Sequence, residues 1–171
     1  MLDQLEHLSG TIRGYEKRIE KLGEEKYPET AILRQVRGVG MLTALAFRLT
    51  LDDLLKFPKN RAAGAYLGLT TRRDQSGSQD KQLGITKQGD PFVRRLLVQS
   101  AHYILGRHGE DSDLRRWGLG LAARGGKAAK KRAIVAVARK LAVLLLALWR
   151  TGEVYEPLRN GKMGEPQGAA C

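Results

Sequence analysis

The sequence has a single cysteine, Cys171 at its last position, and only three scattered histidines. One cysteine excludes a disulfide scaffold within the chain, and this histidine and cysteine content argues against a zinc cluster. The longest apolar run, residues 133–149, is interrupted by Arg139 and Lys140, so no membrane span is predicted. The first ten residues are acidic and amphipathic, unlike a secretory signal. We therefore expect a soluble protein of the reducing cytoplasm without a membrane partner.

Acidic side chains are scarce relative to basic ones. The 171 residues carry 30 Lys and Arg against 18 Asp and Glu, which gives a formal net charge of +12. The surplus is uneven: residues 1–30 are net acidic, whereas residues 121–150 hold eight basic side chains and no acidic one. A basic surplus favours a polyanionic partner, and nucleic acid is the commonest one. The acidic first segment and the basic late segment are therefore expected to have different functions.

The acidic start predicts a coiled-coil helix over residues 1–29, ended by Pro28. Apolar side chains recur there at alternating spacings of three and four, the pattern of a heptad seam. The seam residues are Leu5, Leu8, Ile12, Tyr15, Ile19 and Leu22. About three heptads are marginal alone, so we expect a homo-oligomer through this seam or pairing with a preceding helix. Packing of the helix on its own domain is the alternative.

Residues 32–49 predict a helix-hairpin-helix around Gly38-Val39-Gly40. Two glycines let the backbone turn tightly and approach a phosphate, and amides at the start of the next helix would point at the anion. A plain turn between two helices uses the same residues. Because Arg34 and Arg37 flank the turn, we expect both arginines, with Gly38 and Gly40, to contact the DNA backbone.

The remaining chain has helical periodicity except in residues 68–90. Thr50 is expected to cap a short helix with Asp52 and Asp53 in its first turn, where the helix dipole favours carboxylates. Residues 68–90 form a long polar loop that can hold a short β-hairpin, and loops of this length are often functional. The prediction is an all-α fold with a helical domain over residues 30–158 and a disordered tail over residues 159–171.

One candidate for catalysis lies in this polar loop. Ser76 stands beside Gly77 and shortly after Arg72 and Arg73. A serine hydroxyl could attack a phosphodiester while arginines neutralise its oxygens, although such loops more often contact phosphates or simply turn. The carboxylates do not form the spaced set that a two-metal nuclease needs, so no metal site is expected in the chain.

Five features fall in a recognisable order: GVGMLTALAF, AAGAYLGLT, the SG of RRDQSGSQDK, LGITKQGDPFVRRLLVQSA and a basic final helix. Over residues 30–158 this set resembles the carboxy-terminal domain of the insertion-sequence one-ten family of transposases, relatives of the Piv DNA invertase. The resemblance implies that Ser76 is the nucleophile, that it forms a covalent link to DNA, and that a structured guide RNA directs recombination. Thr71 replaces the usual proline and Ser78 the commoner glycine of that family.

The resemblance also implies a RuvC-like nuclease domain with four acidic metal ligands ahead of the coiled coil. This chain starts at the coiled coil, so any divalent metal cofactor is expected only in that missing domain. The implied function is the DNA-binding, serine-bearing part of a transposase, expected to be inactive as an enzyme without the nuclease domain.

Two alternatives are a non-catalytic helix-hairpin-helix module that binds nucleic acid and a coiled-coil assembly protein. Under the leading interpretation, further DNA-binding candidates share a basic side chain in the polar loop, the helix after it, or the last helix. They are Arg72, Arg73, Lys87, Arg94, Arg95, Lys127, Lys130 and Lys131.

Overall fold

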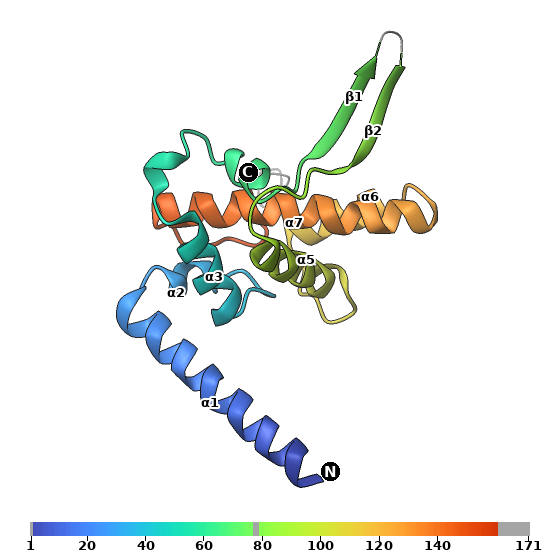
Figure 1. Ribbon diagram of the computed structural model, residues 1–171. Coiled ribbons are helices and arrows are strands. Elements are labelled where there is room, and N and C mark those ends of the chain that lie inside the picture. The colour runs from blue at the N-terminus through green and yellow to red at the C-terminus, as the bar shows by residue number, and fades with distance from the viewer. Residues whose placement is uncertain (1, 77–78, 161–171) are drawn as a thin grey trace, which may run out of the picture.

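The computed structural model describes residues 2–76 and 79–160, and this part of the chain holds seven α-helices, one 3₁₀ turn and one β-hairpin (Figure 1). In chain order the elements are α1 (Leu2–Lys26), α2 (Thr30–Leu33), α3 (Met41–Leu51), η1 (Leu54–Lys56), α4 (Ala62–Tyr66), β1 (Thr71–Ser76), β2 (Gln79–Ile85), α5 (Pro91–Leu105), α6 (Asp113–Ala122) and α7 (Gly126–Thr151). The predicted all-α class is confirmed. None of the described helices is long and apolar enough to cross a membrane.

Helix α7 is the centre of the domain, because α2, α4, α5 and α6 all pack against it. Its inner side is apolar at helical spacing, and burial of each large aliphatic side chain contributes roughly 1.5–3 kcal/mol. The buried residues of α7 include Ala133, Val137, Ala138, Leu141, Ala142, Leu145, Leu146 and Leu148. Phe47 of α3 and Leu97 of α5 complete the same core. Gly152, at φ 68, ends the helix in a left-handed cap.

Helix α1 leaves the domain as a projecting arm (Figure 1). Most side chains at the predicted seam are exposed, with Leu8 at 56% and Tyr15 at 59%, while Ile19 is half-buried. Only the end of the helix is attached, where Gly23 is buried against Met41 and α1 contacts α2 and α3. The seam is therefore not packed on its own domain. Pairing of the seam with a second helix stays a prediction.

The boundary after α3 differs from the prediction at Thr50, which lies within the helix and caps nothing. Leu51 is fully buried, so the apolar periodicity carries α3 two residues further than expected. Asp53 caps the following 3₁₀ turn by accepting a hydrogen bond from the Leu55 amide at 2.8 Å. Asp52 accepts one from Lys56 at 2.9 Å, and this ammonium lowers the pKa of the carboxyl.

The described residues of the polar segment 68–90 form a β-hairpin on a narrow base. Strands β1 and β2 pair antiparallel, with Thr71 opposite Ile85 and Ser76 opposite Gln79. Below them the chain stays paired, since the Lys87 amide donates to the Gly68 carbonyl at 3.1 Å. Gly68 has φ +67, and a side chain there would overlap the backbone of Gln88. The two sides of the hairpin base lie so close together that only glycine fits at position 68.

The predicted tail begins in the described part of the chain and continues beyond it. The Asn160 amide donates to the Asp113 carboxylate at 2.8 Å, and the Asp113 amide donates to the Pro157 carbonyl at 2.7 Å. Residues 159–160 are therefore tied to the start of α6. Residues 161–171, which make up the rest of the predicted tail, lie outside the described residues.

Candidate nucleic-acid interface

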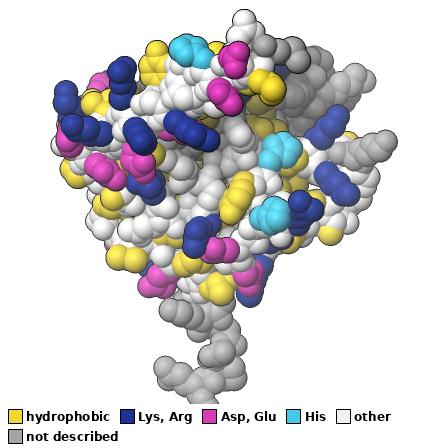
Figure 2. Space-filling view, turned by 90° about the horizontal axis from the view of Figure 1, so that it is seen from below, with side chains coloured by type: hydrophobic (Ala, Val, Ile, Leu, Met, Phe, Trp, Pro, Cys, Tyr) yellow, Lys and Arg dark blue, Asp and Glu magenta, His cyan; other side chains and the backbone are white. Residues whose placement is uncertain are grey.

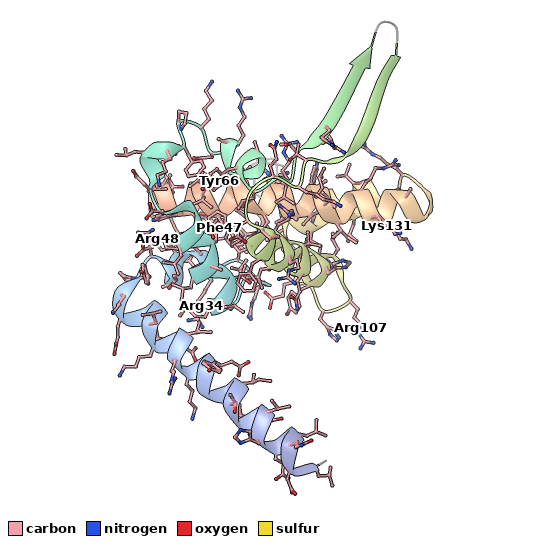
Figure 3. The ribbon with its side chains drawn as sticks, in the orientation of Figure 1. Arg34, Phe47, Arg48, Tyr66, Arg107 and Lys131 are labelled. Atoms are coloured by element: carbon pink, nitrogen blue, oxygen red, sulfur yellow. The ribbon has the colours of Figure 1, made fainter. Side chains whose placement is uncertain are left out.

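Most of the predicted DNA-binding residues lie on two separate surfaces. Figure 3 shows Arg34 beside the root of α1 and Lys131 near the opposite end of the domain, on α7. We call the first the turn surface, defined by Arg34, Arg37, Gly38 and Gly40. We call the second the hairpin surface, defined by β1, β2, their base at residues 84–88, and the basic side chains of α7 from Lys130 to Lys140.

The two glycines of the turn surface have different roles. Gly38 adopts φ +92, and a side chain there would come within 2.8 Å of the Tyr103 ring on α5. Gly40 precedes α3, and a side chain there would meet nothing within 4 Å. Gly38 thus allows the turn to pack on α5, while Gly40 leaves open the approach to the first amides of α3.

Both arginines of the turn surface already have acidic neighbours. Arg34 pairs with Glu20 at 3.6 Å, and Arg37 pairs with Glu110 at 3.0 Å. These ion pairs are exposed, and exposed pairs typically contribute about 0–1 kcal/mol. A phosphate could therefore replace either carboxylate at low cost. Figure 2, seen from this side of the molecule, shows Lys and Arg side chains interspersed with acidic ones and histidines.

On the hairpin surface, Ser76 is the last residue of β1, at the outer end of the hairpin (Figure 1). Strand residues advance about 3.3 Å each, so the backbones of Arg72 and Ser76 lie roughly 13 Å apart. The extended strand therefore places Arg72 farther from Ser76 than a compact loop would. The side chains of Arg73, Ser76 and Lys127, and all of Gly77 and Ser78, lie outside the described part of the structure.

Arg94, one of the predicted DNA-binding residues, is partly buried and makes hydrogen bonds within the domain. Its Nη1 donates to the carbonyls of Leu67, at 3.2 Å, and Gln88, at 2.9 Å. These carbonyls lie on the two sides of the hairpin base, so Arg94 fastens the hairpin to α5. The adjacent Arg95 is exposed, with its guanidinium 5.9 Å from the centre of the Phe92 ring. Arg94 is therefore a positioning residue.

A groove runs between the hairpin base, α6 and α7. Lys87 and Lys131, both predicted, lie on its rim with three basic side chains that the sequence analysis did not select, Arg132, Arg139 and Lys140. Their only signal in the sequence was the excess of basic residues over 121–150. Lys130 is exposed one residue before this rim.

Not every basic residue of α7 serves that surface. Arg150 turns inward and donates to the Phe57 carbonyl, which ties the end of α7 to the segment after η1. Within the described residues, no three His, Cys, Asp or Glu side chains gather in a way that could hold a metal ion.

The structure defines a basic helical domain with a projecting hairpin, and comparison with known proteins gives its family. A model of the transposase IS116/IS110/IS902 family matches residues 30–116, which include the turn surface and the whole hairpin. The chain belongs to this family. The resemblance inferred from the sequence motifs is thereby confirmed at the level of the family.

Individual relatives agree with this assignment. The chain is 34% identical over 125 residues to the transposase for insertion sequence element IS1111A of Coxiella burnetii, covering 72% of this chain and 33% of that protein. It is 32% identical over 158 residues to the "Probable family 20 transposase" of Pseudomonas aeruginosa, covering 91% and 45%. It is 36% identical over 75 residues to the transposase for insertion sequence element IS1328 of Yersinia enterocolitica, covering 44% and 22%. The chain thus spans less than half the length of these relatives.

Proposed function

We propose that this chain is the DNA-binding, serine-bearing part of an insertion-sequence transposase. The observation that carries the proposal is the hairpin: it lies wholly within the family match, its first strand ends at Ser76, and its base adjoins a groove lined by cations. Relatives named as insertion-sequence transposases support the role in transposition. A guide RNA is also a polyanion, and the same cationic surfaces would bind its phosphates.

In the proposed chemistry, the Ser76 hydroxyl oxygen attacks a phosphodiester phosphorus. An oxygen–phosphorus bond forms to the serine, the phosphorus bond to the leaving strand oxygen breaks, and that oxygen takes up a proton. The serine proton passes to a base, which a partner subunit or a preceding domain supplies. Arg72 and Lys87, both exposed near the hairpin base, would hold neighbouring phosphates of the same strand.

Binding to DNA is tested by charge reversal on the hairpin surface. Lys130→Glu with Lys131→Glu should weaken duplex affinity and make the log–log salt dependence shallower, because each phosphate contact contributes a slope of about −0.9. The charge-matched control is Lys56→Glu with Lys59→Glu, at exposed positions away from both surfaces. Equal losses in both double variants would show that only net charge matters and would contradict a specific surface.

The serine assignment is tested in the full-length transposase with a nicked DNA substrate that traps covalent products. Ser76→Ala should abolish covalent attachment while DNA affinity stays within about twofold, since a neutral hydroxyl adds little to phosphate binding. Ser78→Ala, two residues away, is the control and should retain attachment. Attachment at the parental rate by Ser76→Ala would instead favour the alternative function, a non-catalytic nucleic-acid-binding module.

A further inference from the structure

The groove on the hairpin surface has an apolar floor that the proposed DNA contacts do not use. Leu69 and Ile85 come from the hairpin base, Val135 and Val143 from α7, and Trp117 from α6. The groove encloses about 770 Å³ of open space, within the range of ligand sites. Trp117 is 39% exposed. An open apolar floor of this size is costly in water unless an apolar group covers it.

Every charged side chain that lines the groove is basic, among the residues that the structure describes. Lys87 lies on the hairpin side, whereas Lys131, Arg132, Arg139 and Lys140 lie on α7. None of them forms an ion pair with a described carboxylate, unlike the arginines of the turn surface. The occupant is therefore an anion with groups that reach both sides of the groove.

Two of these cationic side chains make contacts that restrict their positions. The Arg139 side chain passes over Gly64, where a Cβ would come within 2.8 Å of its Cγ. The Lys140 ammonium lies 4.3 Å from the centre of the Trp117 ring, a cation–π contact at the edge of the floor. Both side chains therefore have packing contacts within the domain before any ligand binds.

An apolar floor between two rows of cations fits unpaired nucleotides better than a duplex. In a duplex the base faces are stacked inside, so only phosphates, sugars and polar base edges could reach the groove. An unpaired nucleotide offers an apolar base face together with its phosphate, and single-strand sites combine aromatic or apolar platforms with basic rims. The charge and the floor together select this class of ligand.

We propose that the groove binds unpaired nucleotides, with bases over Trp117 and the aliphatic floor and phosphates on the rim. The inference rests on the proposed nucleic-acid binding and adds that this groove prefers single strands to duplexes. The single strand could be displaced DNA or a loop of RNA, since both share the same base and phosphate chemistry.

The matched variants are Ala136→Glu and Ala136→Gln in the full 171-residue chain. Ala136 lines the groove on α7, and both replacements are good helix formers of equal size. Glu places a carboxylate beside the phosphates, whereas Gln adds only bulk. Labelled oligothymidylate, oligouridylate and a duplex of equal length are titrated at one salt concentration.

Ala136→Glu should lower single-strand affinity by about tenfold or more, the scale of one lost base-stacking contact, and Ala136→Gln should lower it by much less. Duplex affinity should change by less than about threefold in both variants. The tighter of the two single strands identifies DNA or RNA as the preferred source, and either result supports the proposal. Equal losses for duplex and single strand would overturn it.

Tryptophan fluorescence supplies a second measurement. Oligothymidylate should quench the tryptophan fluorescence of the parent chain, and Trp117→Leu, which keeps an apolar side chain, should lose that quenching.

Duplex binding without any quenching by single strands would overturn the proposal for the groove but would still support the proposed function. Absence of salt-dependent binding to every nucleic acid would instead contradict the proposed function. Binding of a polyglutamate peptide in place of oligonucleotides would identify an acidic protein segment as the occupant and overturn the proposal.

Discussion

Arg48 determines how α1 is attached to the domain. Its Nε donates to Glu29 and its Nη1 donates to the Asp52 carbonyl at 2.7 Å. The guanidinium also lies 4.5 Å from the centre of the Trp149 ring and 5.7 Å from that of Tyr27. One side chain thus joins the end of α1, the start of α2, α3 and α7. Such a set of contacts needs the planar, multiply donating guanidinium.

Arg48→Lys should therefore lower the free energy of unfolding by about 1–3 kcal/mol, because Lys cannot make all of these contacts and leaves Glu29 poorly paired. Urea denaturation followed by circular dichroism measures the change. Lys56→Ala is the control: it removes only the exposed pair with Asp52 and should cost less than about 1 kcal/mol. Similar losses in the two variants would mean that the Arg48 contacts add little.

At the scale of elements, α1 is a helix that its own domain does not cover. Its periodicity, Leu5 to Leu22, predicted the helix correctly, and the fold leaves that seam exposed. An isolated helix of this length is marginal in water, and its apolar stripe matches a two-helix seam. We therefore expect the seam to pair with a second copy of the chain.

Leu8→Glu with Tyr15→Glu should convert the chain to monomers in sedimentation equilibrium, because carboxylates at seam positions would face each other across the helix pair. Lys17→Gln with Lys21→Gln is the control, with the same change in net charge on the solvated side of α1. Retention of the parental mass by the seam variant would show that α1 does not mediate self-association.

At the scale of the whole molecule, two cationic surfaces lie at different ends of the domain (Figure 3). One uses backbone amides and arginines with displaceable acidic partners, and the other uses a hairpin and the first half of α7. This separation suggests that one DNA or RNA molecule could contact both surfaces at once.

If both surfaces contact the same duplex, their contributions should be nearly additive, because the sites share no neighbours. The losses in binding free energy for Arg34→Glu with Arg37→Glu, and for Lys130→Glu with Lys131→Glu, should then sum to the loss in the quadruple variant within about 0.5 kcal/mol. Fluorescence anisotropy with one long duplex measures all four proteins. A quadruple variant much weaker than that sum would show that the surfaces bind alternatively, because each surface would then compensate for the loss of the other.

The helices were predictable from the sequence because their causes are local. Apolar residues at helical spacing form the inner side of α7, Gly152 ends that helix, and Asp90 caps α5 by accepting hydrogen bonds from the amides of Phe92 and Val93. Thr50 was predicted to cap the next helix, but it lies inside α3 because the helix continues to the buried Leu51. The all-α class and the family resemblance needed nothing beyond such patterns.

The surfaces were decided by contacts between distant residues. Arg94 and Arg95 are chemically identical neighbours, yet only Arg94 is partly buried, since it donates to the Leu67 carbonyl 27 residues earlier in the chain. Lys87 and Lys140 likewise share a groove only because the hairpin base folds over α7. The sequence alone determined which segments are helical and where the charge accumulates. The tertiary structure decided which cations hold the fold and which face a ligand, because burial and pairing depend on elements that meet only after folding.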